Sequence, residues 1–358
     1  MHAELLDLTI IAHDGLHNAF TSLCQWHGQY YCAWRVAPTH HITPPGYLVI
    51  SQRARSGIAT EVGRTILALP GGDCRDPRLY ATPEAIYLLC GAYLPAPHQQ
   101  HWHGLSRVST DNILQTYWSY TTDGQTWAPL APTMRPNYWG WSVLRSKQER
   151  WVVAAYHMGT SNDISGSLSL FIGETLDALT YAGTLYDGID LTTDGSIPHT
   201  PHYLPCEPVL WQPTPDTLAC CARTEAGMDI GISHVPFQNW RWHNTALQLH
   251  PSAMLLTPYG WLLAVREVLS TRPRKGEIPT PPTWRTALYT LPAGLMTPRH
   301  LLTLPSAGDT GYAGLVLDYL NPKKVYVTFY SQHLPQHPTV TNTLPGTNVW
   351  LATVGIGM

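Results

Sequence analysis

Short apolar runs, separated by polar or Pro/Gly-rich turns, recur along the whole chain. Apolar and polar positions alternate within many of them, which is the period of a strand with one buried face. The runs come in pairs joined by a turn, as in "LCQWHGQYYCAWR" and "VLWQPTPDTLACCAR". Each pair predicts an antiparallel hairpin. The second strands of six such hairpins end at Arg35, Tyr93, His157, Arg223, Arg266 and Tyr330.

The gaps between these hairpins leave room for two further strands each, for example "LQTYWSYTTDGQTWAP" after the second hairpin. Six units of four antiparallel strands are typical of a propeller, so we expect an all-β, six-bladed β-propeller that occupies residues 1–358 as a single domain. Only one clear strand, "NVWLATVG", follows the last hairpin. The N-terminal "LLDLTIIA" is expected to supply the missing outer strand and to close the ring, which removes open sheet edges. A five-bladed ring and two stacked sandwiches are the alternatives.

The composition agrees with this fold and argues against several classes of protein. Charged residues make up 13 %, whereas there are 14 Trp, 19 Tyr, 31 Pro and 28 Gly, a mixture that suits short strands joined by turns. The net charge of −3 offers no basic surface for nucleic acid, and the chain has no apolar run long enough to predict a membrane helix. The seven cysteines lack disulfide spacing and the N-terminus lacks the basic segment of a signal peptide. We therefore expect a cytoplasmic protein, or a secreted one if a leader precedes this sequence.

Scarce ionisable and polar residues recur at equivalent hairpin ends. In a propeller the first strand of every blade lines the axis, so the start of that strand and the end of the second strand lie on one face. Residues that converge on one concavity favour a binding or active site. Four long loops, 94–112, 184–204, 270–283 and 333–346, are expected to wall a pocket there. The residues predicted to gather on this face are His17, Asn18, Arg35, His40, His41, Arg75, Asp76, Tyr138, Trp139, His157, Glu207, Arg223, Arg266, Asp309, Tyr312, Tyr330 and His333.

One turn carries a recognisable structural motif. "YTTDGQTW" is similar to the Asp-box turn, Ser/Thr-x-Asp-x-Gly-x-Thr-Trp, with one residue fewer between Asp123 and Thr126. In such a turn the carboxylate of Asp123 is expected to accept backbone N–H groups, while Trp127 packs between strands. The motif indicates a fold and says little about activity.

Four further positions extend the resemblance to chemistry. Glu207 begins a predicted inner strand and Arg223 follows sixteen residues later, Arg266 ends the next hairpin, and Tyr312 lies in "DTGYAGLV". In these residues and in their order the chain resembles the sialidase (neuraminidase) superfamily, and more closely its divergent bacterial exo-sialidase-like members. The resemblance implies that Tyr312 is a nucleophile, that Glu207 is its base, and that the two arginines hold a substrate carboxylate. A phenol needs such a base, because with a pKa of about 10 it is a weak nucleophile while protonated.

Two stretches depart from the family pattern. The family carries its first arginine in an Arg-Ile-Pro motif, whereas the matching stretch here is "HNAF", with His17 and Asn18. The family's acid/base aspartate follows the first hairpin, where this chain reads "RVAPTHHITPPG". His40 and His41 are the proton donors available there, since a histidine with its ordinary pKa of about 6.5 can act as general acid or base at neutral pH.

We therefore predict a sialidase-like glycoside hydrolase that acts on an anionic, carboxylate-bearing sugar. The alternatives are a uronate-type polysaccharide lyase on the same fold and a non-catalytic glycan-binding propeller. The expected partner is a small carbohydrate or a glycan, with no nucleic acid and no membrane, and the oligomeric state is left open. No cofactor or metal is expected, because "HQQHWHG" offers three histidines in a predicted loop without an evident fourth ligand. Beyond Tyr312, Glu207, His40 and His41 as catalytic groups, the predicted substrate-binding residues are Arg223, Arg266, Arg35, Arg75, Asp76, His17, Asn18, Trp139, Asp309, Tyr330 and His333.

Overall fold

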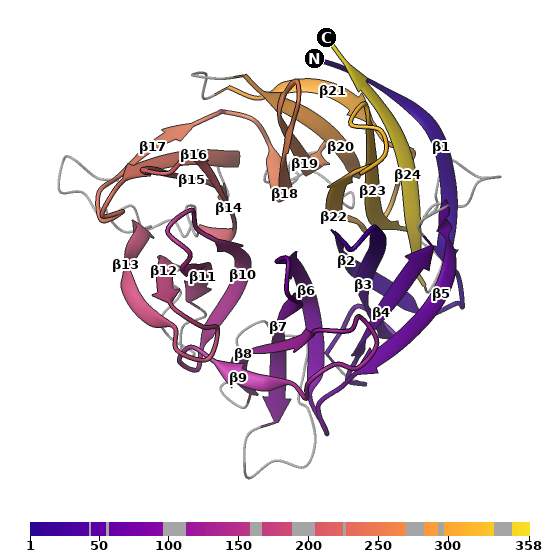
Figure 1. Ribbon diagram of the computed structural model, residues 1–358, viewed down its shortest axis with the longest axis horizontal. Coiled ribbons are helices and arrows are strands. Elements are labelled where there is room, and N and C mark those ends of the chain that lie inside the picture. The colour runs from indigo at the N-terminus through magenta and orange to yellow at the C-terminus, as the bar shows by residue number, and fades with distance from the viewer. Residues whose placement is uncertain are drawn as a thin grey trace, which may run out of the picture.

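The computed structural model describes residues 1–42, 44–54, 57–95, 112–157, 167–187, 205–224, 227–269, 283–292, 297–332 and 346–358. In these residues 24 β-strands form six sheets of four antiparallel strands each. The sheets are arranged as blades around a central axis (Figure 1). The prediction of an all-β, six-bladed propeller is confirmed.

Five blades follow the chain from the axis outward, each beginning with its innermost strand. The first blade contains β2 (His17–Trp26), β3 (Gln29–Ala37), β4 (Tyr47–Ala54) and β5 (Gly57–Leu67). The second contains β6 (Asp73–Ala81), β7 (Ile86–Pro95), β8 (Asn112–Thr121) and β9 (Ala131–Thr133). The third contains β10 (Tyr138–Arg145), β11 (Trp151–His157), β12 (Ser167–Gly173) and β13 (Thr180–Asp187). The fourth contains β14 (Cys206–Thr214), β15 (Thr217–Thr224), β16 (Gly227–His234) and β17 (Trp240–Asn244). The fifth contains β18 (Leu249–Thr257), β19 (Gly260–Val268), β20 (Trp284–Leu291) and β21 (Arg299–Thr303).

The sixth blade is assembled from both ends of the chain. β22 (Thr310–Leu317), β23 (Lys324–Ser331) and β24 (Asn348–Gly357) supply its three inner strands, and β1 (His2–Ala12) is its outer strand. β1 pairs antiparallel with β24 along its whole length, and the two termini lie together at the edge of the ring (Figure 1). The predicted closure by the N-terminal strand is thus confirmed.

The hydrophobic core lies between neighbouring blades. Between the fifth and sixth blades, for example, Leu288 packs in one cluster with Phe329 and Trp350, and all three are buried. Burying a side chain of this size contributes about 2–3 kcal/mol, which is why apolar residues occupy the blade-facing positions of each strand. Six of the seven cysteines are buried. These six cysteines therefore act as small apolar core residues.

The Asp-box turn after β8 forms as its sequence predicts. The Asp123 Oδ1 atom accepts hydrogen bonds from the backbone N–H groups of Gln125 (2.8 Å) and Thr126 (2.7 Å), and these bonds hold the pKa of the Asp123 carboxyl down at about 2. Trp127 is buried in the core between the first two blades. Gly124 has a φ of +74°, where a side chain would also collide with the ring of Tyr31. The turn therefore stabilises the packing between two blades.

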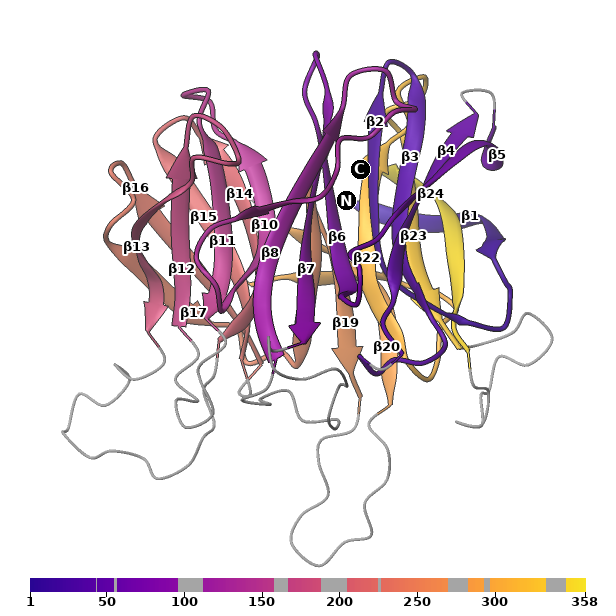
Figure 2. The ribbon, with the colours of Figure 1, turned by 90° about the horizontal axis from the view of Figure 1, so that it is seen from below.

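The ring has two distinct faces. On the hairpin face, turns join the first and second strands of the blades, and this face is at the top of Figure 2. On the loop face, at the bottom of Figure 2, the first strands begin and the second strands end. Most of the four long loops predicted to wall a pocket, together with His333, lies outside the described residues. Within the described residues, no helix has the length and apolar character needed to span a membrane.

Candidate functional site

Irregularities near the start of the inner strands build the candidate site on the loop face. The pairing register shifts at this level in β2, β6, β14 and β22, as in a β-bulge. One residue in each irregular stretch has a left-handed backbone, with φ of 60° at Phe20, 54° at Asp76, 54° at Glu207 and 43° at Tyr312. Such a conformation costs a non-glycine residue about 1–3 kcal/mol and is concentrated at functional sites. All four side chains are buried, and the strained backbone breaks the ordinary alternation of faces at each of them.

The side chains of Tyr312, from β22 in the sixth blade, and Glu207, from β14 in the fourth blade, are in contact near the axis. The Tyr312 hydroxyl donates a hydrogen bond to Glu207 Oε1 at 2.8 Å, the bond expected if Glu207 is the base for this phenol. Arg223 Nη1 donates to the same oxygen at 2.8 Å. Arg266 Nη2 donates to the Tyr312 hydroxyl at 3.0 Å. The phenol is therefore held between a proton acceptor and a cation.

Burial and neighbouring charges shift the pKa values of Tyr312 and Arg223 in opposite directions. Burial raises the pKa of Tyr312 well above its ordinary value, even though the cation of Arg266 acts to lower it. Burial alone would lower the pKa of Arg223, but the adjacent Glu207 carboxylate raises it well above its ordinary range. Without substrate, Tyr312 is thus a neutral phenol whose proton points at Glu207, and Arg223 is a permanent cation.

Arg266 is held by two aromatic rings and by His250. Its guanidinium carbon lies 4.6 Å from the ring centre of Trp284 and 4.7 Å from that of Tyr312. Its Nε and Nη2 atoms donate to His250 Nδ1 at 3.1 and 2.9 Å. In the part of the chain that the structure describes, no carboxylate lies within 4 Å of it. A Cβ at Gly311 (φ +127°) would press on the Arg266 side chain. The absence of a side chain at Gly311 therefore leaves the space that Arg266 occupies.

A second hydrogen-bonded group, formed by His17, His40 and Asp309, lies beside the pair. Asp309 Oδ2 contacts His17 Nε2 at 2.9 Å and His40 Nδ1 at 2.7 Å, and the Tyr330 hydroxyl donates to Asp309 Oδ1 at 3.0 Å. Burial lowers the pKa of His17 to about 4, so this histidine is neutral near pH 7. Burial opposes ionisation of Asp309, but the two histidines hold its pKa far below the usual range. His40 is half-exposed, and its ring contacts Phe20, which in turn contacts Tyr312.

The same three side chains have the spacing of a candidate metal site. Their nearest ligand atoms lie within 4.8 Å of one another, as a chelated ion would require. However, Arg35 Nη1 lies 3.4 Å from His17 Nδ1 and can only donate, so the Nε2 atom of neutral His17 carries the proton and faces Asp309. An ion would have to displace that proton beside a buried guanidinium. The residues fit a histidine–carboxylate hydrogen-bond relay better than a metal centre.

Several residues predicted for the pocket instead support its walls. Arg35 is fully buried, and its guanidinium donates to Asp73 and to the backbone carbonyls of Thr39 and His41. Asn18 is also fully buried and is hydrogen bonded through its side chain to Asp14 and Trp34. These contacts fix the segment that carries His40.

His40 and His41 are equivalent candidates in the sequence, and the structure distinguishes them. Both are exposed, but only the side chain of His40 bonds to Asp309. The contacts that the structure gives for His41 are made by its backbone, whose N–H donates to Thr39 and whose carbonyl accepts from Arg35. His40 is therefore the histidine that the fold brings to the site.

Asp76 and Arg75 form a further part of the site. Asp76 is buried and accepts a hydrogen bond from the indole of Trp139 at 3.1 Å, and burial raises its pKa to about 6. Arg75 donates to Asp73, and its guanidinium lies 5.6 Å from the ring centre of Phe20. Phe20 occupies the left-handed position in β2. The stretch "HNAF" therefore contributes an apolar ring to the site, and the Arg75 guanidinium lies over that ring.

Arg78, which the sequence reasoning missed, also lies next to this group. Its guanidinium stacks 4.2 Å from the ring centre of Trp141, and the charges of Asp76 and Glu207 offset part of the fall in its pKa that burial causes. Strict alternation from Arg75 would have placed Arg78 on the opposite side of the strand, and the bulge between them reverses this. His250, Trp284 and Trp141 were missed as well. No motif in the sequence marks these three residues as neighbours of a charged site.

Comparisons with known proteins support the fold. No protein-family model and no curated protein matches this chain. A protein of unknown function from Dyadobacter fermentans has a similar structure, with a TM-score of 0.75 and 17 % identity over 99 % of this chain and 100 % of that one. The Trypanosoma rangeli sialidase in complex with the inhibitor DANA has a TM-score of 0.62 at 10 % identity, over 94 % of this chain and 55 % of that one.

A third structure, the Hadza microbial sialidase Hz136, has a TM-score of 0.64 at 11 % identity, over 95 % of this chain and 66 % of that one. The chain thus spans between 55 and 66 % of the length of the two sialidases. At such identities the likeness shows a fold shared with sialidases, and a fold by itself does not determine an activity.

Proposed function

We propose that this protein is a glycoside hydrolase that acts on a sugar bearing a carboxylate or another anionic group, with Tyr312 as its nucleophile. The observation that carries the proposal is the hydrogen bond of 2.8 Å from the Tyr312 hydroxyl to Glu207, together with the cation of Arg266 on the same hydroxyl. A carboxylate can take the phenol proton as the oxygen attacks, and a guanidinium can stabilise the developing phenolate. A neutral nucleophile also avoids the repulsion that an anionic sugar would exert on a carboxylate.

The arginines support the anionic substrate class. Arg266 is buried without a carboxylate partner among the described residues, and it interacts electrostatically with Arg223. Two neighbouring guanidinium groups attract an anion and can hold a carboxylate in a bidentate manner. Binding such a group would also offset the cost of keeping Arg266 buried as an unpaired cation.

The proposed reaction has two steps. In the first, the Tyr312 oxygen attacks the anomeric carbon and gives its proton to Glu207, while His40 protonates the departing oxygen. In the second, His40 takes a proton from the incoming water, the water oxygen bonds to the anomeric carbon, and the tyrosine leaves and recovers its proton from Glu207. Asp309 on Nδ1 of His40 would stabilise the imidazolium and leave Nε2 for the substrate. Two displacements at one carbon predict retention of configuration.

One observation also favours elimination on a uronic acid as a second candidate. The proton-transfer group at this site is a histidine–aspartate pair, and such a pair can remove the proton next to a carboxylate that arginines neutralise. The product of elimination contains a carbon–carbon double bond beside the carboxylate and absorbs ultraviolet light, whereas the product of hydrolysis does not.

The test is a panel of fluorogenic glycosides of sialic and uronic acids, together with uronate oligosaccharides followed by ultraviolet absorbance. A matched control for Tyr312→Phe is Tyr186→Phe, because Tyr186 is a buried tyrosine in β13 whose hydroxyl also donates to a carboxylate, Asp229, at 2.7 Å. Hydrolysis should disappear in Tyr312→Phe and persist in Tyr186→Phe. A fluorinated substrate analogue that traps the glycosyl-enzyme should label the peptide containing Tyr312. Absence of turnover on the whole panel, or a label on another residue, would contradict the proposal.

A further inference from the structure

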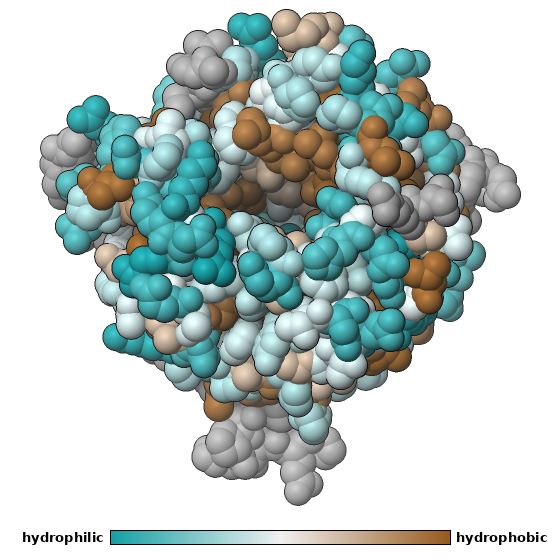
Figure 3. Space-filling view, viewed as in Figure 1, coloured by the Kyte–Doolittle hydropathy of each residue, from teal (hydrophilic) through white to brown (hydrophobic). Residues whose placement is uncertain are grey.

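A cavity with a volume of about 520 Å³ opens along the axis on the hairpin face, opposite the candidate site. Figure 3 shows this face, with a hollow at the axis and hydrophobic residues gathered over β18. The cavity is walled largely by apolar side chains from several blades, such as Leu210, Met254 and Leu315. Three of its lining residues are cationic, Arg78, Arg145 and Lys147, and none is acidic.

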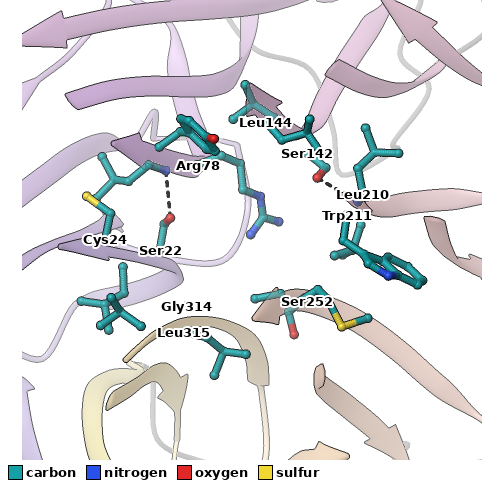
Figure 4. Close-up of a pocket in the computed structure, with 18 of the residues that line it drawn as sticks. Ser22, Cys24, Arg78, Ser142, Leu144, Leu210, Trp211, Ser252, Gly314 and Leu315 are labelled. Atoms are coloured by element: carbon teal, nitrogen blue, oxygen red, sulfur yellow. Dashed lines mark hydrogen bonds between the residues drawn. The ribbon is translucent and has the colours of Figure 1, made fainter. Parts of the chain in front are cut away.

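Arg78 is a buried charged residue in the wall of this cavity. It is 8 % exposed, and Figure 4 shows its guanidinium pointing toward the centre of the cavity. Its Nε and Nη2 atoms are buried and have no hydrogen-bond partner among the described residues, and no carboxylate lies within ion-pair distance there. A buried guanidinium with two unused N–H directions is costly, because each donor has lost water without gaining an acceptor.

Two hydroxyl groups beside Arg78 are also free to donate. Ser22 Oγ accepts a hydrogen bond from the backbone N–H of Leu79 at 2.9 Å, and Ser142 Oγ accepts one from the N–H of Leu210 at 3.0 Å (Figure 4). Because each oxygen is used here as an acceptor, its own proton remains available to a ligand. The first, second and third blades thus contribute donors to one cavity: Ser22, Arg78 and Ser142.

We propose that the axial cavity is an anion-binding site in which Arg78 holds the charged group and the two serine hydroxyls complete its hydrogen bonds. The ligand is a singly charged anionic group, either a free halide-sized anion or the carboxylate of an acid whose apolar part lies along the wall. Stacking on Trp141 keeps the guanidinium plane in position while its edge faces the ligand. The cavity opens on the face opposite the loop-face site, and Arg78 lies between the two. The anion proposed here does not depend on the activity proposed for Tyr312 and Glu207.

The inference is tested with two probes on the full chain. Crystals are soaked in sodium bromide, and the ion is located by its anomalous scattering. Sodium octanoate is titrated calorimetrically into the wild type and into Arg78→Met, which keeps an unbranched side chain but removes the charge and the N–H donors. Arg266→Met is the matched control, because it removes a buried arginine from the loop-face site and leaves the axial cavity intact.

We expect bromide beside Arg78 on the hairpin side, or octanoate binding that Arg78→Met weakens by about tenfold or more, since a hydrogen-bonded charge pair contributes about 1.5–3 kcal/mol. Bromide alone identifies a free anion as the ligand, and octanoate binding identifies a carboxylate with an apolar tail. The binding that Arg78→Met removes should persist in Arg266→Met, because Arg266 does not line the axial cavity. If Arg78→Met does not fold, Arg78→Lys and the bromide density in the wild type still decide the question. Water alone at Arg78 with no octanoate binding, or binding that is lost only in Arg266→Met, would overturn the proposal.

Discussion

Replacing Tyr312 by phenylalanine separates a chemical role of this residue from a structural one. The substitution keeps the ring, which packs against Phe20 and Trp141, and removes only the hydroxyl. That hydroxyl makes two hydrogen bonds, one to Glu207 at 2.8 Å and one from Arg266 at 3.0 Å. The proposed mechanism gives this atom the bond-forming step, so its loss should abolish turnover while the fold remains intact.

The effect on stability follows from the partners that stay behind. After the substitution Glu207 Oε1 still accepts from Arg223 at 2.8 Å, and Arg266 Nη2 still contacts His250 at 2.9 Å. Because neither charged group loses its last partner, the cost should lie at the low end for hydrogen bonds to charges, about 1–2 kcal/mol. In a chain of this size that corresponds to a fall in Tm of only a few degrees, at about 2 °C per kcal/mol. The loss of a nucleophile, in contrast, should lower kcat by about a thousandfold or more, at least about 4 kcal/mol of barrier.

The assay is thermal melting beside turnover on the best substrate of the panel, for Tyr312→Phe, Glu207→Gln and the double variant. The tyrosine and the glutamate act on the same proton, so the double variant should be little slower than either single one. A Tyr312→Phe protein that keeps more than about a tenth of wild-type turnover would refute the nucleophile assignment, since losing this group alone should cost far more. Activity that falls only in proportion to the folded fraction would show that the hydroxyl has a structural role.

Three further predictions concern the surrounding residues. Arg266→Lys should raise KM for an anionic substrate about tenfold, because an ammonium cannot reproduce the two parallel N–H donors of a guanidinium. An unchanged KM would exclude a carboxylate contact at this position. The pKa of His17 falls from its ordinary 6.5 to about 4 on folding. Between these two pH values the unfolded chain therefore binds a proton that the folded chain does not, and stability falls as the pH is lowered through this window. His17→Gln should flatten that fall in Tm, and an equally steep profile in the variant would contradict the assignment. Asp123→Ala removes the two hydrogen bonds from backbone N–H groups that close the Asp-box turn. It should therefore lower Tm while turnover per folded molecule stays the same. A fall in kcat would contradict a purely structural role for the turn.

The sequence alone predicted the architecture, because that part of the structure depends on local patterns. Period-two alternation marks the strands, turn residues separate the hairpins, and the count of hairpins indicates six blades. The adjacency of Glu207 and Arg223 was also predictable, since both lie on one hairpin, in which Cys206 pairs with Arg223. The predicted bond between Tyr312 and Glu207 rested on the resemblance to a family, because the two residues are separated by 105 positions and by a third of the ring.

Only the tertiary structure decided which residues near the axis face a ligand. Alternation assigns the two faces of a strand correctly only while its register is unbroken, and residue type does not reveal a bulge or a left-handed backbone. The bulge in β6 therefore turns Arg78 toward the axis, which strict alternation did not predict. The left-handed backbone of β2 brings Phe20, which the sequence did not single out, against Tyr312. Likewise, nothing local distinguishes His40 from His41. The difference arises because ring closure brings Asp309, from the far end of the chain, within 2.7 Å of one of them.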